Sequence, residues 1–187
     1  MYKEQLINEY KKHKKEIQEK LKRFRNINRQ KYKQELFFCL LTPQSKAEKC
    51  WQAVEKLQNC NLKENNIKNI QDCLKSRTRF YRNKARYLIE ANKKIKELKQ
   101  LINSNKSPRE IRKLLTDSKS KYRIKGLGMK EASHFLRNIG KSKNKLAILD
   151  RHILEQLKKL KIIDKEIRLS NKNYLKIENK LKKLKSH

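Results

Sequence analysis

The chain has 187 residues, and 52 Lys and Arg against 19 Asp and Glu leave a formal net charge of +33. This length allows one sizeable core or two small lobes, and so large a positive charge attracts polyanions, which makes nucleic acid the expected partner. Because no apolar stretch approaches the roughly 18 residues of a membrane span and charged residues follow the first Met closely, we expect no membrane partner and an intracellular protein, cytoplasmic or nucleoid-associated.

An all-α fold is predicted, because the chain holds three glycines and two prolines and its apolar residues recur at spacings of three and four. No segment reads as a strand. The four cysteines lie far apart without a C-x-x-C pair, so we expect reduced thiols in the core and no metal site. They are Cys39, Cys50, Cys60 and Cys73.

The first expected helix covers residues 2 to about 25 and packs through one apolar stripe, formed by Leu6, Tyr10, Ile17, Leu21 and Phe24. The uninterrupted apolar run 36–41 follows and predicts a helix at the centre of the core. Pro43 then breaks the pattern, and Ser45 with Glu48 predicts a capping box for the next helix. Gln44 is therefore expected on a loop against a helix N-terminus.

A shorter helix through Ile67, Ile70 and Leu74 leads to a long helix from about 79 to 102, whose opening is dense in aromatic and cationic residues. After a polar break, Ser107, Pro108 and Glu110 predict a capped helix start. The chain is expected to form one unit over residues 1–187, with a lobe boundary near 103–107.

A helix-hairpin-helix is predicted at about 111–140, because Gly126 and Gly128 flank Leu127 directly before a helix start. Leu127 can anchor the turn in the core while backbone N–H groups and the helix N-terminus face a phosphate. Such a hairpin grips a DNA backbone without reading sequence. Taken alone, however, the Gly-x-Gly pattern also fits an ordinary turn between helices.

The residues after the hairpin separate these interpretations. Lys130 lies two positions past Gly128, Gly140 closes that helix, and Asp150 is placed to cap a helix through Leu160, before a last helix at about 173–184. This ordered set resembles the helix-hairpin-helix DNA glycosylase superfamily. The chain is most similar to the archaeal-type 8-oxoguanine DNA glycosylase/lyase family over most of residues 30–180, through the segments 35–44, 79–82, 130–138 and 150–154.

The resemblance implies a two-lobed helical enzyme with a DNA-binding cleft between the lobes, which flips a damaged guanine out of the duplex. Lys130 would attack the sugar C1′ and form a Schiff base, and β-elimination would then cut the strand 3′ to the abasic site. Asp150 would stabilise the cationic sugar and transfer protons. No cofactor is required. The chain also lacks the cysteines of the iron–sulfur relatives, which argues against the endonuclease III and adenine-mismatch branches.

Other positions are expected at the DNA. Gln44 resembles the residue that related enzymes insert where the flipped base was, and a solvated loop residue is the alternative. The remaining candidates are Gly126, Gly128, Arg82, Arg151 and His152 for DNA binding, and Phe80, Tyr81 and Met129 for the base pocket. Core packing is the alternative for Phe80 and Tyr81.

The C-terminal end of the sequence departs from the pattern of the family. The family usually continues into an aromatic-containing C-terminal helix, with a final lysine whose carboxylate helps to recognise 8-oxoguanine, and this sequence ends at Lys185-Ser186-His187. Two other functions remain open: a non-catalytic helix-hairpin-helix protein that holds duplexes, and a ribosome-associated or RNA-binding helical protein. The expected partner is duplex DNA with oxidised guanine or abasic sites, bound by a monomer.

Overall fold

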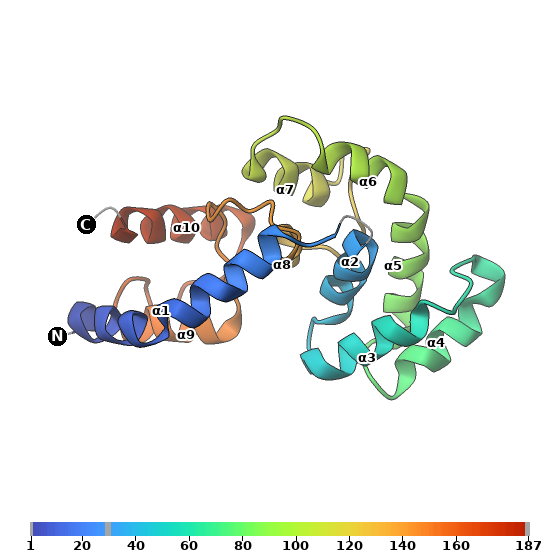
Figure 1. Ribbon diagram of the computed structural model, residues 1–187, viewed down its shortest axis with the longest axis horizontal. Helices are drawn as coiled ribbons and strands as arrows, with labels where there is room; N and C mark the ends of the chain where they lie inside the picture. The colour runs from blue at the N-terminus through green and yellow to red at the C-terminus, as the bar shows by residue number, and fades with distance from the viewer. Residues whose placement is uncertain (1, 29–30, 186–187) are drawn as a thin grey trace.

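The computed structural model describes residues 2–28 and 31–185, with side chains described from residue 4 to 183. Its elements are all helical, as the sequence predicts (Figure 1). They are α1 (Tyr2–Arg25), α2 (Tyr32–Leu41), α3 (Ala47–Leu57), the short 3-10 helix η2 (Glu64–Asn66), α4 (Ile67–Lys75), α5 (Tyr81–Lys93), α6 (Ile95–Ile102), α7 (Pro108–Thr116), α8 (Met129–Asn138), α9 (Arg151–Lys159) and α10 (Asn171–Lys185).

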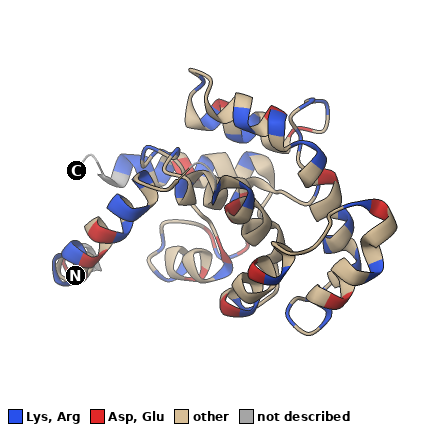
Figure 2. Ribbon diagram, turned by 45° about the vertical axis from the view of Figure 1, so that its right-hand side comes forward, with Lys and Arg blue, Asp and Glu red and all other residues tan. Residues whose placement is uncertain are grey.

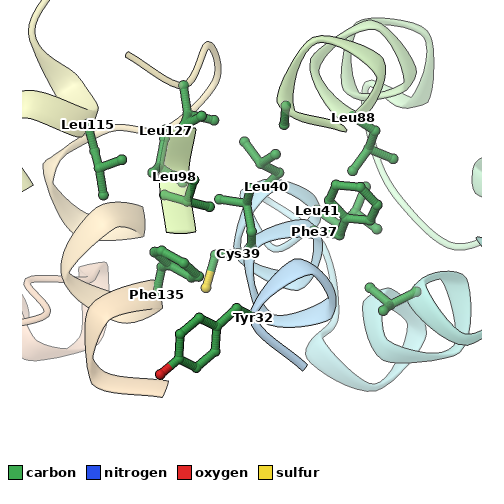
Figure 3. Packing of buried hydrophobic residues seen from close by; sticks show 14 of the residues in the cluster. Tyr32, Phe37, Cys39, Leu40, Leu41, Leu88, Leu98, Leu115, Leu127 and Phe135 are labelled. Carbon is green, nitrogen blue, oxygen red and sulfur yellow. The ribbon is translucent and has the colours of Figure 1, made fainter. Parts of the chain in front are cut away.

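Helix α2 is the centre of the core, as expected for its apolar run. It packs against α3, α5 and α8, and Figure 3 shows its side chains between Leu88 of α5 and Phe135 of α8. Five residues of the run are no more than 3% exposed, namely Leu36, Phe37, Cys39, Leu40 and Leu41. Burying each large apolar side chain stabilises the fold by roughly 1.5–3 kcal/mol, so α2 makes a large contribution.

The buried apolar residues of the described part of the chain form two cores. The first extends from Tyr32 to Ile139, and the second consists of Leu149, Leu157, Ile163, Tyr174 and Ile177. The segment 103–107 does not divide them, because the residues of α6 before it and of α7 after it lie in the same core. That segment is a turn between two amphipathic helices on one core, and the cores separate after Ile139.

Gly140 makes the turn at this division. Its φ is +71°, and a Cβ there would lie 2.6 Å from the carbonyl oxygen of Phe24, so the end of α1 approaches a backbone that tolerates only glycine. The predicted stripe of α1 packs only at this end. Leu21 and Phe24 are half-buried, whereas Leu6, Tyr10 and Ile17 are 53%, 49% and 38% exposed. None of the described helices is both long and apolar enough to cross a membrane.

The predicted helix boundaries are partly correct. Ser107 and Glu110 form the expected capping box, but the long helix expected to reach 102 breaks at Lys94, whose Nζ donates to the Arg123 carbonyl at 2.8 Å. No capping box forms at Ser45, because its hydroxyl bonds to residues of the α5 region, and α3 begins after Lys46. The four cysteines are free thiols, two buried and two half-buried.

A buried ion pair fixes α10 against α7. The Arg112 guanidinium donates to both carboxylate oxygens of Glu178, at 2.7 and 2.9 Å, and both side chains are 1% exposed. Burial raises the pKa of Glu178, but hydrogen bonds from Arg112 and the Ala147 N–H outweigh it and hold the net pKa below its ordinary value. The carboxylate therefore stays charged and joins α7, α10 and the segment before Asp150.

We predict that Glu178→Gln lowers the free energy of unfolding by about 3 kcal/mol or more, because it leaves the Arg112 charge buried beside a neutral partner. Urea unfolding at pH 7 measures the change. Glu155→Gln is the matched control, since Glu155 pairs with Arg151 on the exposed surface of α9 and should change stability by less than about 1 kcal/mol. An equal decrease in the free energy of unfolding of the two variants would show that the buried ion pair stabilises the fold no more than the exposed one.

Candidate active site

The hairpin between α7 and α8 is seated on the first core. Ile124 and Leu127 are 2% and 4% exposed, and the Ile124 N–H donates to the Leu115 carbonyl at 3.1 Å. Gly126 has φ +85°, and a Cβ there would lie 2.4 Å from the Tyr87 ring. Glycine is therefore required at 126 both for its backbone conformation and for the close approach to α5.

Gly128 precedes the first residue of α8 and has extended backbone with no side-chain cap. The first N–H groups of a helix have no intrahelical partner, and the helix dipole favours negative charge at this end. Gly128 is exposed, as is Gly126. The hairpin thus leaves a helix N-terminus of the kind that binds a phosphate.

Lys130 is the second residue of α8, and its side chain is 28% exposed. Its Nζ lies 3.1 Å from Oε1 of Glu131, whose side chain is 14% exposed. The sequence singled out Asp150 as the carboxylate partner and did not consider Glu131. An acidic residue in the first turn of a helix is the signal that was available, because the helix dipole stabilises its charge there.

Asp150 forms the predicted N-cap of α9, since its Oδ1 accepts a hydrogen bond of 2.8 Å from the Ile153 N–H. The side chain is half-buried, so the carboxylate is fixed but still accessible. It serves as a cap whether or not it also takes part in chemistry. Arg151 and His152 are exposed in the first turn of α9, and Arg151 Nε lies 3.5 Å from Oε1 of Glu155.

His134 lies on the same helix as Lys130, and the charges of Lys130 and Asp150 both act on its imidazole. The pKa of His134 is lowered to about 4, chiefly by burial and also by the charges of Arg137 and Lys130, while the charge of Asp150 opposes the shift. The imidazole is therefore neutral at pH 7, within electrostatic reach of both residues. Its ring stands edge-on to Phe38 of α2 at 5.8 Å. The sequence assigned His134 no role, although it lies four residues after Lys130 on the same helix.

Lys130 also lies at the junction of the two cores. Met129 packs against the second core, whereas Ala132, one turn further on, belongs to the first. A cavity of about 290 Å³ opens here, lined by Met129, Lys130, Glu131, Leu149, Leu169, Ser170, Asn171 and Tyr174. A larger hollow of about 640 Å³ between α7 and α10 shares Met129 as a wall residue. The nucleophile candidate thus lines a cavity whose apolar wall residues Met129, Leu149 and Tyr174 belong to or pack against the second core.

Gln44 and Phe80 form a second group of candidates at the turns before α3 and α5. Gln44 is exposed with φ +53°, and Phe80 is 54% exposed with φ +56°. The Arg79 N–H donates to Ser45 Oγ at 2.9 Å, which brings the two turns together. Phe80 therefore presents an aromatic ring to solvent next to the loop of Gln44, and it is not a core residue.

Tyr81 and Arg82 open α5 beside this group. Tyr81 is half-buried and packs against the first core, so core packing accounts for at least part of its side chain. Arg82 is exposed, with its guanidinium 5.7 Å from the Tyr81 ring centre. Lys and Arg lie along all the described α-helices, with fewer acidic residues between them (Figure 2).

The chain is similar to proteins of known activity over almost its whole length. A family model described as 8-oxoguanine DNA glycosylase matches residues 11–187. The 8-oxoguanine DNA glycosylase/AP lyase of Fusobacterium nucleatum is 39% identical over 97% of this chain and 88% of its own length. The protein of the same name from Methanocaldococcus jannaschii is 36% identical over 90% of this chain and 77% of its own.

Solved structures agree with these matches. The crystal structure of the M. jannaschii 8-oxoguanine glycosylase/lyase in complex with a 15mer DNA containing 8-oxoguanine superimposes with a TM-score of 0.84 at 31% identity, covering 100% of this chain and 89% of that one. The Thermotoga maritima 8-oxoguanine DNA glycosylase gives a TM-score of 0.81 at 28% identity, with 98% and 86% covered. The chain therefore belongs to the 8-oxoguanine DNA glycosylase family.

Proposed function

We propose that this protein removes 8-oxoguanine from duplex DNA and cuts the strand at the resulting abasic site, with Lys130 as the covalent nucleophile. The observation that carries the proposal is the position of Lys130, in the first turn of the helix behind the hairpin and in the wall of the cavity that Met129, Leu149 and Tyr174 also line. A hairpin that holds the backbone places the target nucleotide within reach of this turn.

The proposed reaction begins when the Lys130 ammonium gives a proton to a neighbouring carboxylate and the free amine attacks C1′ of the extruded nucleotide. The bond between C1′ and the base breaks, and the base leaves with its electron pair and takes up a proton. Ring opening then gives a Schiff base between Nζ and C1′. Loss of a proton from C2′ expels the 3′ phosphate by β-elimination, and water releases the lysine.

Two carboxylates support this chemistry. Asp150 is fixed by its hydrogen bond to the Ile153 N–H, so an ionised oxygen stands ready to stabilise positive charge on the sugar and to accept protons. Glu131 contacts the Lys130 ammonium in the free protein and holds the amine at the start of α8. His134, neutral at pH 7, adds no positive charge beside the reacting lysine.

For DNA binding, we propose that the hairpin at Gly126 and Gly128 holds one phosphate and that Arg151 and His152, exposed at the start of α9, contact the backbone. Gln44 enters the space that the flipped base leaves, with Arg82 nearby on the DNA face. Met129 lines the base pocket, as do Phe80 and Tyr81. The protein acts as a monomer on chromosomal DNA inside the cell.

We predict that Lys130→Gln abolishes the covalent adduct that borohydride traps between the wild-type protein and a duplex with 8-oxoguanine. Affinity for the duplex should stay within about threefold, because one charge among many is removed. Lys119→Gln, which removes an exposed lysine from the loop before the hairpin, is the control and should trap like the wild type.

Duplexes bearing 8-oxoguanine, an abasic site or plain guanine separate the parts of this proposal. An adduct on the abasic duplex alone would keep the lyase and contradict base recognition. No adduct on any duplex, despite tight binding, would favour the non-catalytic DNA-binding function. Equal loss of trapping and binding in a folded Lys130→Gln protein would contradict the nucleophile assignment.

We predict that Asp150→Asn lowers the single-turnover rate of base excision by about a hundredfold or more, because it removes the charge that acts on the sugar and the proton acceptor. Asparagine also caps helices well, so α9 and the melting temperature should change little. Quenched-flow cleavage of an 8-oxoguanine duplex and a thermal melt provide the two measurements. A normal rate would reduce Asp150 to its capping role.

A further inference from the structure

Lys84 is a buried lysine on α5 that the proposed reaction does not use. Its side chain is 3% exposed, and its Nζ lies 2.6 Å from the Leu41 carbonyl oxygen, 2.9 Å from that of Pro43 and 3.0 Å from Ser45 Oγ. Removing an ammonium group from water is costly unless hydrogen bonds replace the water. Here each of its three protons has an acceptor, and all three acceptors belong to the turn between α2 and α3.

This turn carries Gln44. The residues on either side of Gln44 are both bonded to Lys84, and Ser45 is held further by the Arg79 N–H at 2.9 Å and by its own N–H to the Thr42 carbonyl at 3.0 Å. Gln44 itself is exposed in a left-handed conformation, with φ +53°. Residues other than glycine keep that conformation only where the surroundings impose it.

The lysine is charged under ordinary conditions. Burial lowers the pKa of Lys84 to about 8, so at pH 7 most molecules carry the ammonium and all three donors are present. A neutral side chain of similar length, such as methionine, fills the same space but donates no hydrogen bond. Such a replacement would therefore remove three of the hydrogen bonds that hold the turn and leave the bonds from the Arg79 and Ser45 N–H groups.

We propose that Lys84 is a positioning residue for base extrusion, which fixes the 41–45 turn so that Gln44 is already shaped to enter the duplex where the damaged nucleotide leaves it. A preformed turn loses less conformational freedom on binding than a flexible one. The inference rests on the proposed role of Gln44 in the duplex, and it is independent of the Lys130 chemistry.

The test compares two substrates in the wild type, Lys84→Met, Gln44→Ala and the double variant. One is an 8-oxoguanine duplex, and the other is a single strand with an abasic site, which has no opposite strand for Gln44 to enter. Lys84→Met should lower the single-turnover rate on the duplex by about tenfold, but the rate on the single strand by only about twofold. The double variant should be no slower than Gln44→Ala.

Lys93→Met is the matched control, because it removes an exposed lysine from the far end of the same helix, and it should leave both rates at wild-type values. Equal losses of Lys84→Met on the two substrates would overturn the proposal, and so would multiplied losses in the double variant. Ser45→Ala removes one acceptor without changing the buried amine. Ser45→Ala should also lower the rate on the duplex more than the rate on the single strand, with smaller losses than Lys84→Met. It replaces Lys84→Met as the test if that variant folds poorly.

Hydrogen exchange of the Ser45 amide tests the anchor without reference to activity. It should exchange about tenfold faster in Lys84→Met, because opening of the turn becomes easier, and unchanged exchange would overturn the proposal. Faster exchange together with a normal duplex rate for Gln44→Ala would overturn the Gln44 step while leaving the Lys130 chemistry intact. Absence of activity in the wild type would instead contradict the proposed function itself.

Discussion

The buried Arg112–Glu178 pair is the constraint on which the geometry of the site depends. Arg112 of α7 also donates to Ser133 of α8 at 2.9 Å, and Ser133 in turn donates to the Met129 carbonyl in the turn that carries Lys130. Glu178 accepts the Ala147 N–H at 2.8 Å, three residues before Asp150. One ion pair thus ties together α8, which carries Lys130, and the segment that leads to Asp150.

Tyr174 completes this network from α10. Its hydroxyl donates to the Ala147 carbonyl at 2.7 Å and accepts from the Leu149 N–H at 3.3 Å, so an extended segment without a strand partner has its backbone groups satisfied by a side chain. The second core is small, and hydrogen bonds of this kind fix its position relative to the first. Residues from the two cores need such directional hydrogen bonds to keep a fixed relative position, because apolar packing is non-directional.

Much of this arrangement could be predicted from local sequence signals. The central position of α2 follows from its apolar run, the start of α7 from its capping box, and the cap at Asp150 from the residue type before an amphipathic helix. Each of these depends on residues close together in the chain. The hairpin, with its two glycines, belongs to the same class of short-range signal.

What the sequence did not reveal depends on contacts between distant residues. Ser45 has the spacing of a cap but bonds to Arg79 and Lys84, more than thirty residues away, and no local pattern shows this. The polar composition of 103–107 does not show that the helices on either side of it pack on one core. Glu131 and Lys84 were overlooked since charged residues are usually solvated, and only the fold shows which of them are partly or fully buried.

Basic residues lie on all the described α-helices (Figure 2), and their lysines fall into two functional classes. Many exposed lysines attract any duplex, so the loss of one of them lowers the non-specific affinity for DNA only slightly. This affinity falls as the salt concentration rises. A single lysine that acts as a nucleophile, the role proposed for Lys130, is not replaced by lysines elsewhere on the surface. A lineage of these proteins can therefore exchange much of its surface charge while the chemistry at one amine stays the same.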